Sequence, residues 1–445
     1  MLGSLYGLKR AVVLLPVAWT GAWIGYYAYT DTLRRSHIRE RNKELSKTLM
    51  GLPGEGPDFT QPASDIEREA LKKRYSSLRF AGRYWNPYVE WREQGAWEWA
   101  LWKIVLSTIT LKLFYNGGVP PERPIPDLPI EEPDFDLLYP SSPSAPATES
   151  NGKSPISSPD SPREPFSGGA NVEATDKLTM TWLGQSTSYV TLDNLAILTD
   201  PALNDRTLPS RLAPQRLRPS PCSLDQLKRV DVVLVSHNHY DHLDPEHIKE
   251  LGDSCEWIVP IGVGPFIRKH GATRVTELDW WQETKHTLSR PGQKDKTFTI
   301  TAVPNMHWSA RSPLDTNATL WSAFHVKSDS DKPKSFLHLG DTGYSSTLYH
   351  AVGRVLGPVD LAAIPIGSYE PRWHMHLQHT DPEGAVRMAL QMHVKKSVGV
   401  HWGTWLMSDE AYNKPPLDLE IARQKLDVTE DQFCVLPAGK TIVVE

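Results

Sequence analysis

Cysteine is scarce in this chain of 445 residues: only Cys222, Cys255 and Cys434 occur, far apart and without a CxxC pair. This pattern predicts neither a disulfide framework nor a thiolate zinc site, and it fits a reducing compartment. An excess of positive charge is also missing, because the formal net charge is -5. Without a basic surface, nucleic acid is not an expected partner.

Charged side chains are absent from one N-terminal stretch, residues 11–29, which reads AVVLLPVAWTGAWIGYYAY. A helix of this length and composition is long enough to cross a bilayer, so we predict a single-pass membrane anchor within residues 1–30. Basic residues follow it at Arg34, Arg35, Arg39, Arg41 and Lys43. By the positive-inside rule, they place the rest of the chain on the cytoplasmic or mitochondrial matrix side of a membrane. A cleaved signal peptide or a mitochondrial targeting segment is the competing interpretation.

Tryptophan, by contrast, is plentiful, with 16 residues. Because several lie before residue 110 and Trp and Tyr favour membrane interfaces, we predict that residues 31–140 form a helical, aromatic-rich, membrane-proximal region. Within it, residues 82–115 are expected to form an aromatic loop and an apolar helix, which lies on a membrane, packs on the main domain or serves a homodimer. Residues 141–176, rich in Ser and Pro, are predicted to be a disordered insert.

Short apolar runs alternate with turn signals and helical stretches from residue 177 onward, as in DVVLVSH and SFLHLGD. This alternation predicts a layered domain of the α/β class over residues 177–445. Several runs end near residues suited to a site, among them Asp200, His237, Asp341 and His401. We therefore expect a site that is assembled from loops at one edge of a sheet.

The segment SHNHYDHLD at residues 236–244 directly follows the apolar run VVLV. In an extended chain His237 and His239 point to the same side and can hold one metal ion, while the following turn brings Asp241 and His242 toward a second. Three further candidate ligands follow other apolar runs: His307, Asp341 and His401. A single His or Asp after a strand is more often a cap or a residue that supports a ligand, but their joint occurrence after the His-rich loop predicts two metal sites.

With these residues the chain resembles the metallo-beta-lactamase superfamily, whose HxHxDH loop is matched at residues 237–242. The resemblance covers about residues 177–445 and implies a four-layer αβ/βα sandwich with a metal pair at one edge. The segments TWLGQST, GDTGY, PIGSYEPRW and QHTDPEGAV, with GRYWNPYVEW at residues 82–91, resemble the phospholipase D family that hydrolyses N-acyl phosphatidylethanolamines. The N-terminal anchor, the Ser/Pro insert and Gly384, where the family tends to have glutamate, depart from that pattern.

The resemblance implies two Zn²⁺ ions as cofactors, although the residues alone also allow iron or manganese. The implied ligands of one ion are His237, His239 and His307. Those of the other are Asp241, His242 and His401, and Asp341 bridges the two ions.

Further residues are implied around the metals. Asp200 and Thr342 are expected to orient the metal ligands, because ligating histidines commonly donate their other ring N–H to a carboxylate or carbonyl. Gln378 and His379 are expected to bind the substrate, with His379 also able to protonate near the leaving group. Tyr369, Arg372 and Trp373 are expected to line a lipid groove. The alternatives are turn capping for Asp200 and Thr342, a structural histidine for His379, and core or surface packing for Tyr369, Arg372 and Trp373.

The function that the resemblance implies is a zinc-dependent phosphodiesterase of the phospholipase D type. Hydroxide bridging the metals, with Asp241 and Asp341 as catalytic ligands, attacks phosphorus of a membrane phospholipid and yields N-acylethanolamine and phosphatidic acid. Two alternatives stay open, since function does not follow from fold. One is a hydrolase of the same fold that acts on a lactone, a thioester or another phosphodiester, and the other is a membrane-anchored scaffold with a vestigial metal site.

Overall fold

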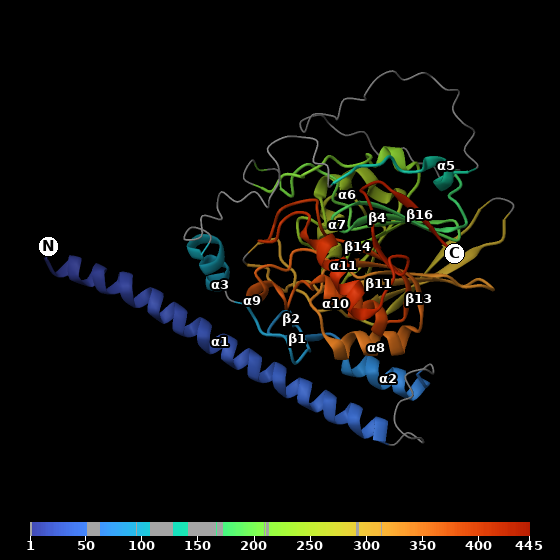
Figure 1. The fold of residues 1–445 in the computed structure, drawn as a ribbon. Helices are drawn as coiled ribbons and strands as arrows, with labels where there is room; N and C mark the ends of the chain where they lie inside the picture. The colour runs from blue at the N-terminus through green and yellow to red at the C-terminus, as the bar shows by residue number, and fades with distance from the viewer. Residues whose placement is uncertain are drawn as a thin grey trace.

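The chain is described here from a computed structural model. The described residues are 2–50, 63–94, 96–106, 128–140, 166, 172–208, 210, 213–290, 293–312 and 314–445; the side chains of residues 2–19, 96 and 97 are not described. Two sheets lie at the centre, and a long N-terminal helix runs along one side of the body (Figure 1).

Each central sheet has seven strands, and in both sheets parallel and antiparallel pairs are mixed. The first sheet contains, in spatial order, β16 (Thr441–Val444), β3 (Leu178–Gly184), β4 (Thr187–Leu192), β5 (Leu195–Thr199), β6 (Val232–Leu234), β7 (Glu256–Pro260) and β8 (Val275–Leu278). The second contains β15 (Phe433–Val435), β14 (Val394–Val400), β13 (Val359–Pro365), β12 (Ser335–His338), β11 (Ala323–Ser328), β10 (Lys296–Val303) and β9 (Glu283–Leu288). Strands β3 to β6 are buried along their whole length, as expected for a sheet that is covered on both faces.

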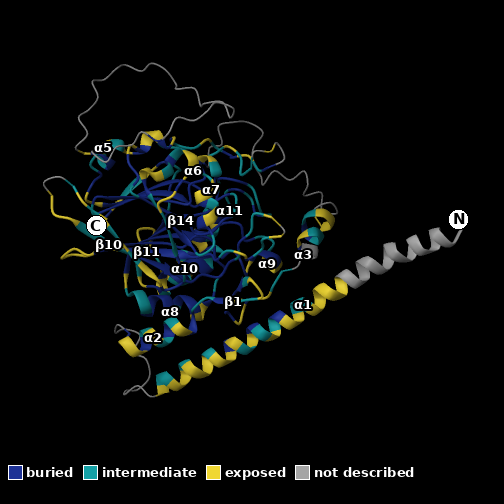
Figure 2. Ribbon diagram, turned by 180° about the vertical axis from the view of Figure 1, so that it is seen from behind, coloured by how far each residue is buried: buried dark blue, intermediate teal, exposed yellow. Residues whose placement is uncertain are grey.

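Helices cover the outer face of each sheet, and the inner faces pack on each other. Met180 of the first sheet and Phe336 of the second belong to one hydrophobic core, whereas Trp257 of the first sheet and Ile248 of a helix belong to another. Short helices lie beside the first sheet: α5 (Phe135–Leu138), η3 (Asp225–Leu227), α6 (Pro245–Leu251), η4 (Gly252–Ser254) and α7 (Gly264–Lys269). The second sheet is accompanied by α8 (Ser346–Leu356), α9 (Arg372–Met375), α10 (Pro382–Gln391) and α11 (Lys414–Leu426). The arrangement is the αβ/βα sandwich that the resemblance implies; the buried strands lie at its centre (Figure 2).

The N-terminal region packs against this sandwich. It contains α1 (Leu2–Met50), α2 (Asp65–Arg74), β1 (Leu78–Phe80), β2 (Arg83–Trp85), α3 (Ala96–Ala100) and the π-helix η1 (Leu101–Leu106). Helix α2 lies between α1 and α8 (Figure 1). A buried ion pair of 2.7 Å between Glu67 and Arg354 joins α2 to α8. Of the predicted aromatic segment, Trp85, Trp91 and Trp102 are buried, so these rings pack on protein.

The predicted anchor within residues 1–30 falls mostly on side chains outside the described ones. Across the described residues, we find no helix with both the length and the apolar composition needed to span a membrane. The anchor therefore stays a prediction.

At Arg34, Phe166 and Thr175 the structure shows packing that the sequence does not indicate. Arg34, counted above among the basic residues that flank an anchor, is fully buried, because backbone carbonyls and Asp31 satisfy its guanidinium group. The predicted disordered insert includes Phe166 and Thr175, which are buried and donate backbone hydrogen bonds to Glu250 and Leu138. Apolar contacts offset the ordering entropy at these two positions. Residues 141–165 and 167–171 of that insert lie outside the described residues.

Candidate metal centre

The candidate ligands gather at one edge of the sandwich because each one follows the carboxyl end of a strand. His237 to His242 come after β6, Asp341 after β12 and His401 after β14, and β12 to β14 run parallel. His307 follows β10. The seven residues predicted as ligands fall into two neighbouring groups. A third group, His307, Asp341 and His379, shares His307 with the first and Asp341 with the second.

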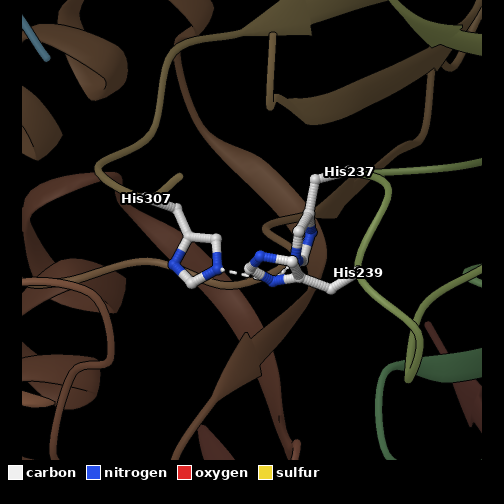
Figure 3. Close-up of side chains that lie close together, drawn as sticks. All are labelled: His237, His239 and His307. Atoms are coloured by element: carbon white, nitrogen blue, oxygen red, sulfur yellow. Dashed lines mark hydrogen bonds between the residues drawn. The ribbon is translucent and has the colours of Figure 1, made fainter. Parts of the chain in front are cut away.

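The first group consists of three imidazole rings that point toward one another (Figure 3). Nδ1 of His239 lies 2.7 Å from Nε2 of His237 and 3.4 Å from Nε2 of His307. Two of the outer nitrogens are held by the protein: Nδ1 of His307 donates to the backbone oxygen of Gln378 at 2.8 Å, and Nδ1 of His237 lies 2.9 Å from the Ser236 hydroxyl. Nε2 of His239 has no hydrogen-bond partner among the described residues. Three inner nitrogens are thus free to share one ion.

The second group combines two imidazoles with two carboxylates. Nε2 of His242 and Nε2 of His401 each lie 3.1 Å from Asp341 and 3.4 Å from Asp241. The same Asp341 carboxylate lies 3.8 Å from Nε2 of His307 and 4.0 Å from Nε2 of His237. Asp341 therefore stands between the two groups, where a bridging ligand would stand.

The donor set fits divalent metal ions. Among the described residues, Nε2 of His242 and Oδ1 of Asp341 are buried and have no hydrogen-bond partner, which is rare for buried polar atoms. Histidine nitrogens turned inward, with the other ring nitrogen bonded to a carbonyl or carboxylate, are the usual arrangement of metal ligands. Nitrogen and oxygen ligands without thiolate suit zinc.

Burial and charge shift the histidine pKa values in opposite directions in the two groups: they lower those of His239 and His307 and raise that of His401. Burial lowers the pKa of His239 to about 4 and that of His307 to about 3, so both rings are neutral at pH 7. Burial also opposes the charged form of His401, but Asp341 and Asp241 outweigh it and raise the pKa of His401 to about 9. The carboxylates of the second group thus favour positive charge where a metal ion would bind.

Asp200 holds the second group from behind. Its carboxylate accepts hydrogen bonds from the Ser236 backbone at 2.6 Å, the Ser236 hydroxyl at 2.7 Å, and ring nitrogens of His242 and His338 at 2.8 Å each. Burial raises the pKa of Asp200, but the two histidines outweigh it and lower this pKa to about 2. Asp200 therefore contacts a candidate metal ligand, His242, directly. Because Nδ1 of His242 donates its proton to Asp200, the lone pair of Nε2 points toward the second group.

Two residues of the site are missed by the sequence reading. Nε2 of Gln185 lies 2.8 Å from both Asp241 and His401, and Gln185 has a left-handed backbone (φ 49°) that three backbone hydrogen bonds support. His338 contacts Asp200 from within β12. Gln185 lies in the quoted TWLGQST segment, and His338 lies in SFLHLGD, where a strand histidine reads as core.

The residues predicted around the metals differ in how close they lie to the candidate ligands. Nδ1 of His379 lies 3.8 Å from Asp341, so this ring borders the metal groups. Gln378 contributes its backbone oxygen, whereas its side chain contacts the sulfur of Met375. The Thr342 hydroxyl accepts from the backbone of Met306 and supports the loop that leads to His307.

The predicted groove residues have other partners. The Tyr369 hydroxyl donates to Asp418 of α11 at 2.6 Å, and the Arg372 guanidinium pairs with Asp381. The indole of Trp373 is partly exposed. The structure therefore does not bring the polar ends of Tyr369 and Arg372 among the metal ligands.

Known proteins are similar to this chain in sequence. A family model described as a beta-lactamase superfamily domain matches residues 196–402. The N-acyl-phosphatidylethanolamine-hydrolyzing phospholipase D, mitochondrial, of Saccharomyces cerevisiae is 32% identical over 381 residues, which are 83% of this chain and 77% of the yeast protein. The chain belongs to this phospholipase D family of the metallo-beta-lactamase superfamily. Within that family, N-acyl-phosphatidylethanolamine-hydrolyzing phospholipase D 1 of Caenorhabditis elegans is 35% identical over 271 residues, 58% of this chain and 74% of the worm protein.

The resemblance stated from the motifs is thereby confirmed, and the chain is a metal-dependent hydrolase of the phosphodiesterase type. A solved metallo hydrolase of Ignicoccus hospitalis is similar in fold, with 19% identity and a TM-score of 0.42, and covers 60% of this chain and 99% of its own. The alignment with the yeast phospholipase D is longer than residues 177–445, so it also includes part of the N-terminal region.

Proposed function

We propose that this family member hydrolyses N-acyl phosphatidylethanolamine to N-acylethanolamine and phosphatidic acid with two zinc ions. The observation that carries the proposal is the convergence of the seven predicted ligands into two groups with Asp341 between them, in a chain related to two phospholipases D of that specificity. In the reaction, the oxygen of water bonds to phosphorus, the bond from phosphorus to the ethanolamine oxygen breaks, and that oxygen takes up a proton.

Two bound divalent ions supply Lewis acidity, which acidifies a water molecule and offsets negative charge on phosphoryl oxygens. The protein positions the ligands for this chemistry. Gln185 holds the Asp241 carboxylate, and Asp200 holds His242 with its proton at Nδ1. Such supporting contacts fix the orientation and the tautomer of a ligand.

His379 is the residue to which we assign contact with substrate. Its ring is buried beside Asp341, and burial lowers the pKa of His379 to about 3, so the ring is neutral at pH 7. A neutral imidazole carries one proton and can donate it in a hydrogen bond to a phosphoryl or leaving-group oxygen. Nδ1 of His379 is buried and makes no hydrogen bond to the described residues, which leaves this atom available.

The substrate class implies that the protein works at a membrane. We include in the proposal an association with a mitochondrial membrane, because the yeast relative is named as mitochondrial. The anchor and its topology, and the homodimer, stay predictions. Fractionation of cells that express the tagged chain tests the location: a wholly soluble, non-mitochondrial distribution contradicts it.

Purified protein tests the activity itself. The wild type is assayed on N-acyl phosphatidylethanolamine beside a panel of lactones, with and without a chelator, and Asp241→Asn serves as the matched inactive control. We expect lipid hydrolysis that chelation abolishes. Hydrolysis of the lactones alone would refute the proposed substrate, and activity that survives both chelation and the substitution would refute the metal mechanism.

A further inference from the structure

The segment of residues 84–91, which lies outside the part matched by the superfamily model, is in direct contact with the loop that carries His307. The amide of Asn86 donates to the backbone oxygen of His307 at 2.7 Å, and both residues are fully buried. The Tyr88 hydroxyl donates to the backbone oxygen of Asn305 at 3.0 Å. Two hydrogen bonds thus reach the His307 loop from a strand end more than two hundred residues earlier.

The His307 loop is linked in turn to the loop that carries the bridging carboxylate. The Asn305 amide donates to the backbone oxygens of Leu339 and Asp341 at 2.9 and 3.0 Å. The Asn305 side chain thus connects the His307 loop to the backbone of Asp341. The N-terminal segment contacts the His307 loop directly.

Helix α1 holds this segment through one buried side chain. The guanidinium group of Arg34 donates to the backbone oxygens of Tyr88 at 2.6 Å, Trp91 at 2.8 Å and Asn86 at 3.3 Å, and it pairs with Asp31 at 2.7 Å. A fork of five donors in fixed geometry suits such a set of acceptors, and lysine cannot reproduce it. Arg34 thereby fixes the backbone of the segment between Asn86 and Trp91.

Burial of Asn86 is not explained by stability alone. Its carboxamide oxygen is buried and has no hydrogen-bond partner among the described residues, and such an unsatisfied acceptor costs free energy. An apolar side chain of similar shape would avoid that cost but could not donate to His307. The Asn86 side chain is therefore explained by its hydrogen bond to the backbone oxygen of His307.

We propose that Asn86 is a positioning residue for the metal ligand His307, and that Arg34 of α1 holds Asn86 in place. On this basis α1 and residues 84–91 are parts of the metal centre, although they lie outside the superfamily domain. The inference rests on the proposed function in one respect, namely that the three-histidine group binds a metal ion. Nothing in it depends on the identity of the lipid.

Titration of the full-length, metal-free protein with Co²⁺ against a competing chelator tests the inference, because it reports metal affinity without substrate. The variant Asn86→Asp keeps the shape of the side chain and turns an acceptor toward the His307 carbonyl. Arg34→Gln removes the fork. Arg35→Gln is the matched control, because Arg35 is the next residue on α1, is 61% exposed in its side chain and also pairs with Asp31.

We expect the wild type and Arg35→Gln to bind two Co²⁺ ions, and Asn86→Asp and Arg34→Gln to bind one of the two about 10 to 100 times more weakly. A purely structural role would lower the unfolding temperature of the metal-free variants and leave both affinities unchanged. Equal affinities in all four proteins overturn the inference.

A wild type that binds no Co²⁺ overturns the metal centre itself, which separates this failure from the previous one. If Asn86→Asp does not fold, Asn86→Ser replaces it, because the serine side chain stays polar but is too short to reach His307. Weaker Co²⁺ binding by Asn86→Ser then supports the inference, and wild-type affinity overturns it.

Discussion

Replacing Asp200 by asparagine tests how the protein prepares a metal ligand. One Asp200 oxygen, Oδ1, accepts from the Ser236 backbone, while Oδ2 accepts from the Ser236 hydroxyl, His242 and His338. An amide group can accept at only one of these two positions. In either orientation the new NH₂ group therefore faces at least one buried donor. Where it takes the Oδ2 position it faces Nδ1 of His242, and that ring is pushed toward the tautomer with its proton on the inward nitrogen.

The expected magnitudes follow from these contacts. A buried donor left without an acceptor costs about 1–3 kcal/mol of folding free energy. Loss of a carboxylate that orients a ligating histidine lowers metal affinity about 10 to 100 times, which corresponds to about 1.4–2.7 kcal/mol. Stability and metal affinity should both fall in Asp200→Asn, and the second effect is the specific one.

Asp360→Asn is the matched control for this experiment. Asp360 is also a buried carboxylate that accepts from the backbone and the hydroxyl of one serine, Ser335, at 2.8 and 3.0 Å, but its other partner is Lys395. Thermal unfolding of the metal-free proteins and Zn²⁺ competition with a chelator are measured for both variants. Both should lose stability, and only Asp200→Asn should lose metal affinity. Wild-type metal affinity in Asp200→Asn would show that Asp200 does not prepare His242 for metal binding.

Three further predictions concern the same region. Gly343→Ala places a Cβ atom where it would lie 2.1 Å from the Leu377 carbonyl oxygen, so it should destabilise the fold by about 1–3 kcal/mol; an unchanged unfolding temperature would contradict this packing. His379→Ala should keep both metal ions, as metal analysis would show, but lower kcat/KM about 100-fold or more, as expected for the loss of a donor to developing charge; wild-type turnover would exclude the assigned contact. Removal of metal by chelation should lower the unfolding temperature, because a ligand at 100 times its Kd stabilises the fold by about 2.7 kcal/mol, and an unchanged temperature would argue against tightly bound ions.

The candidate metal ligands could be predicted from the sequence because their spacing and their position after apolar runs are set by local geometry. His237 and His239 alternate within one extended segment, and His307, Asp341 and His401 each follow a strand. The sandwich followed from the family resemblance. In these respects local chemistry and global fold point to the same structure.

Residues whose role depends on distant partners could not be found in this way. Arg34 reads as one of several basic residues after an apolar stretch, and only the packing of residues 86–91 on α1 shows that it is buried. Tyr369 and Arg372 carry groups suited to a lipid phosphate, yet Asp418 and Asp381 engage them. Sequence shows which group a side chain carries, and tertiary contacts decide what that group meets.

Hydrolysis in ¹⁸O-labelled water shows which bond of the substrate is broken. The purified zinc-loaded protein is incubated with N-acyl phosphatidylethanolamine, and both products are examined by mass spectrometry. Attack on phosphorus at the Asp341-centred site predicts one ¹⁸O atom in phosphatidic acid and none in N-acylethanolamine, and no products from Asp341→Asn. Label in N-acylethanolamine, or absence of both products from the zinc-loaded wild type, would contradict the account.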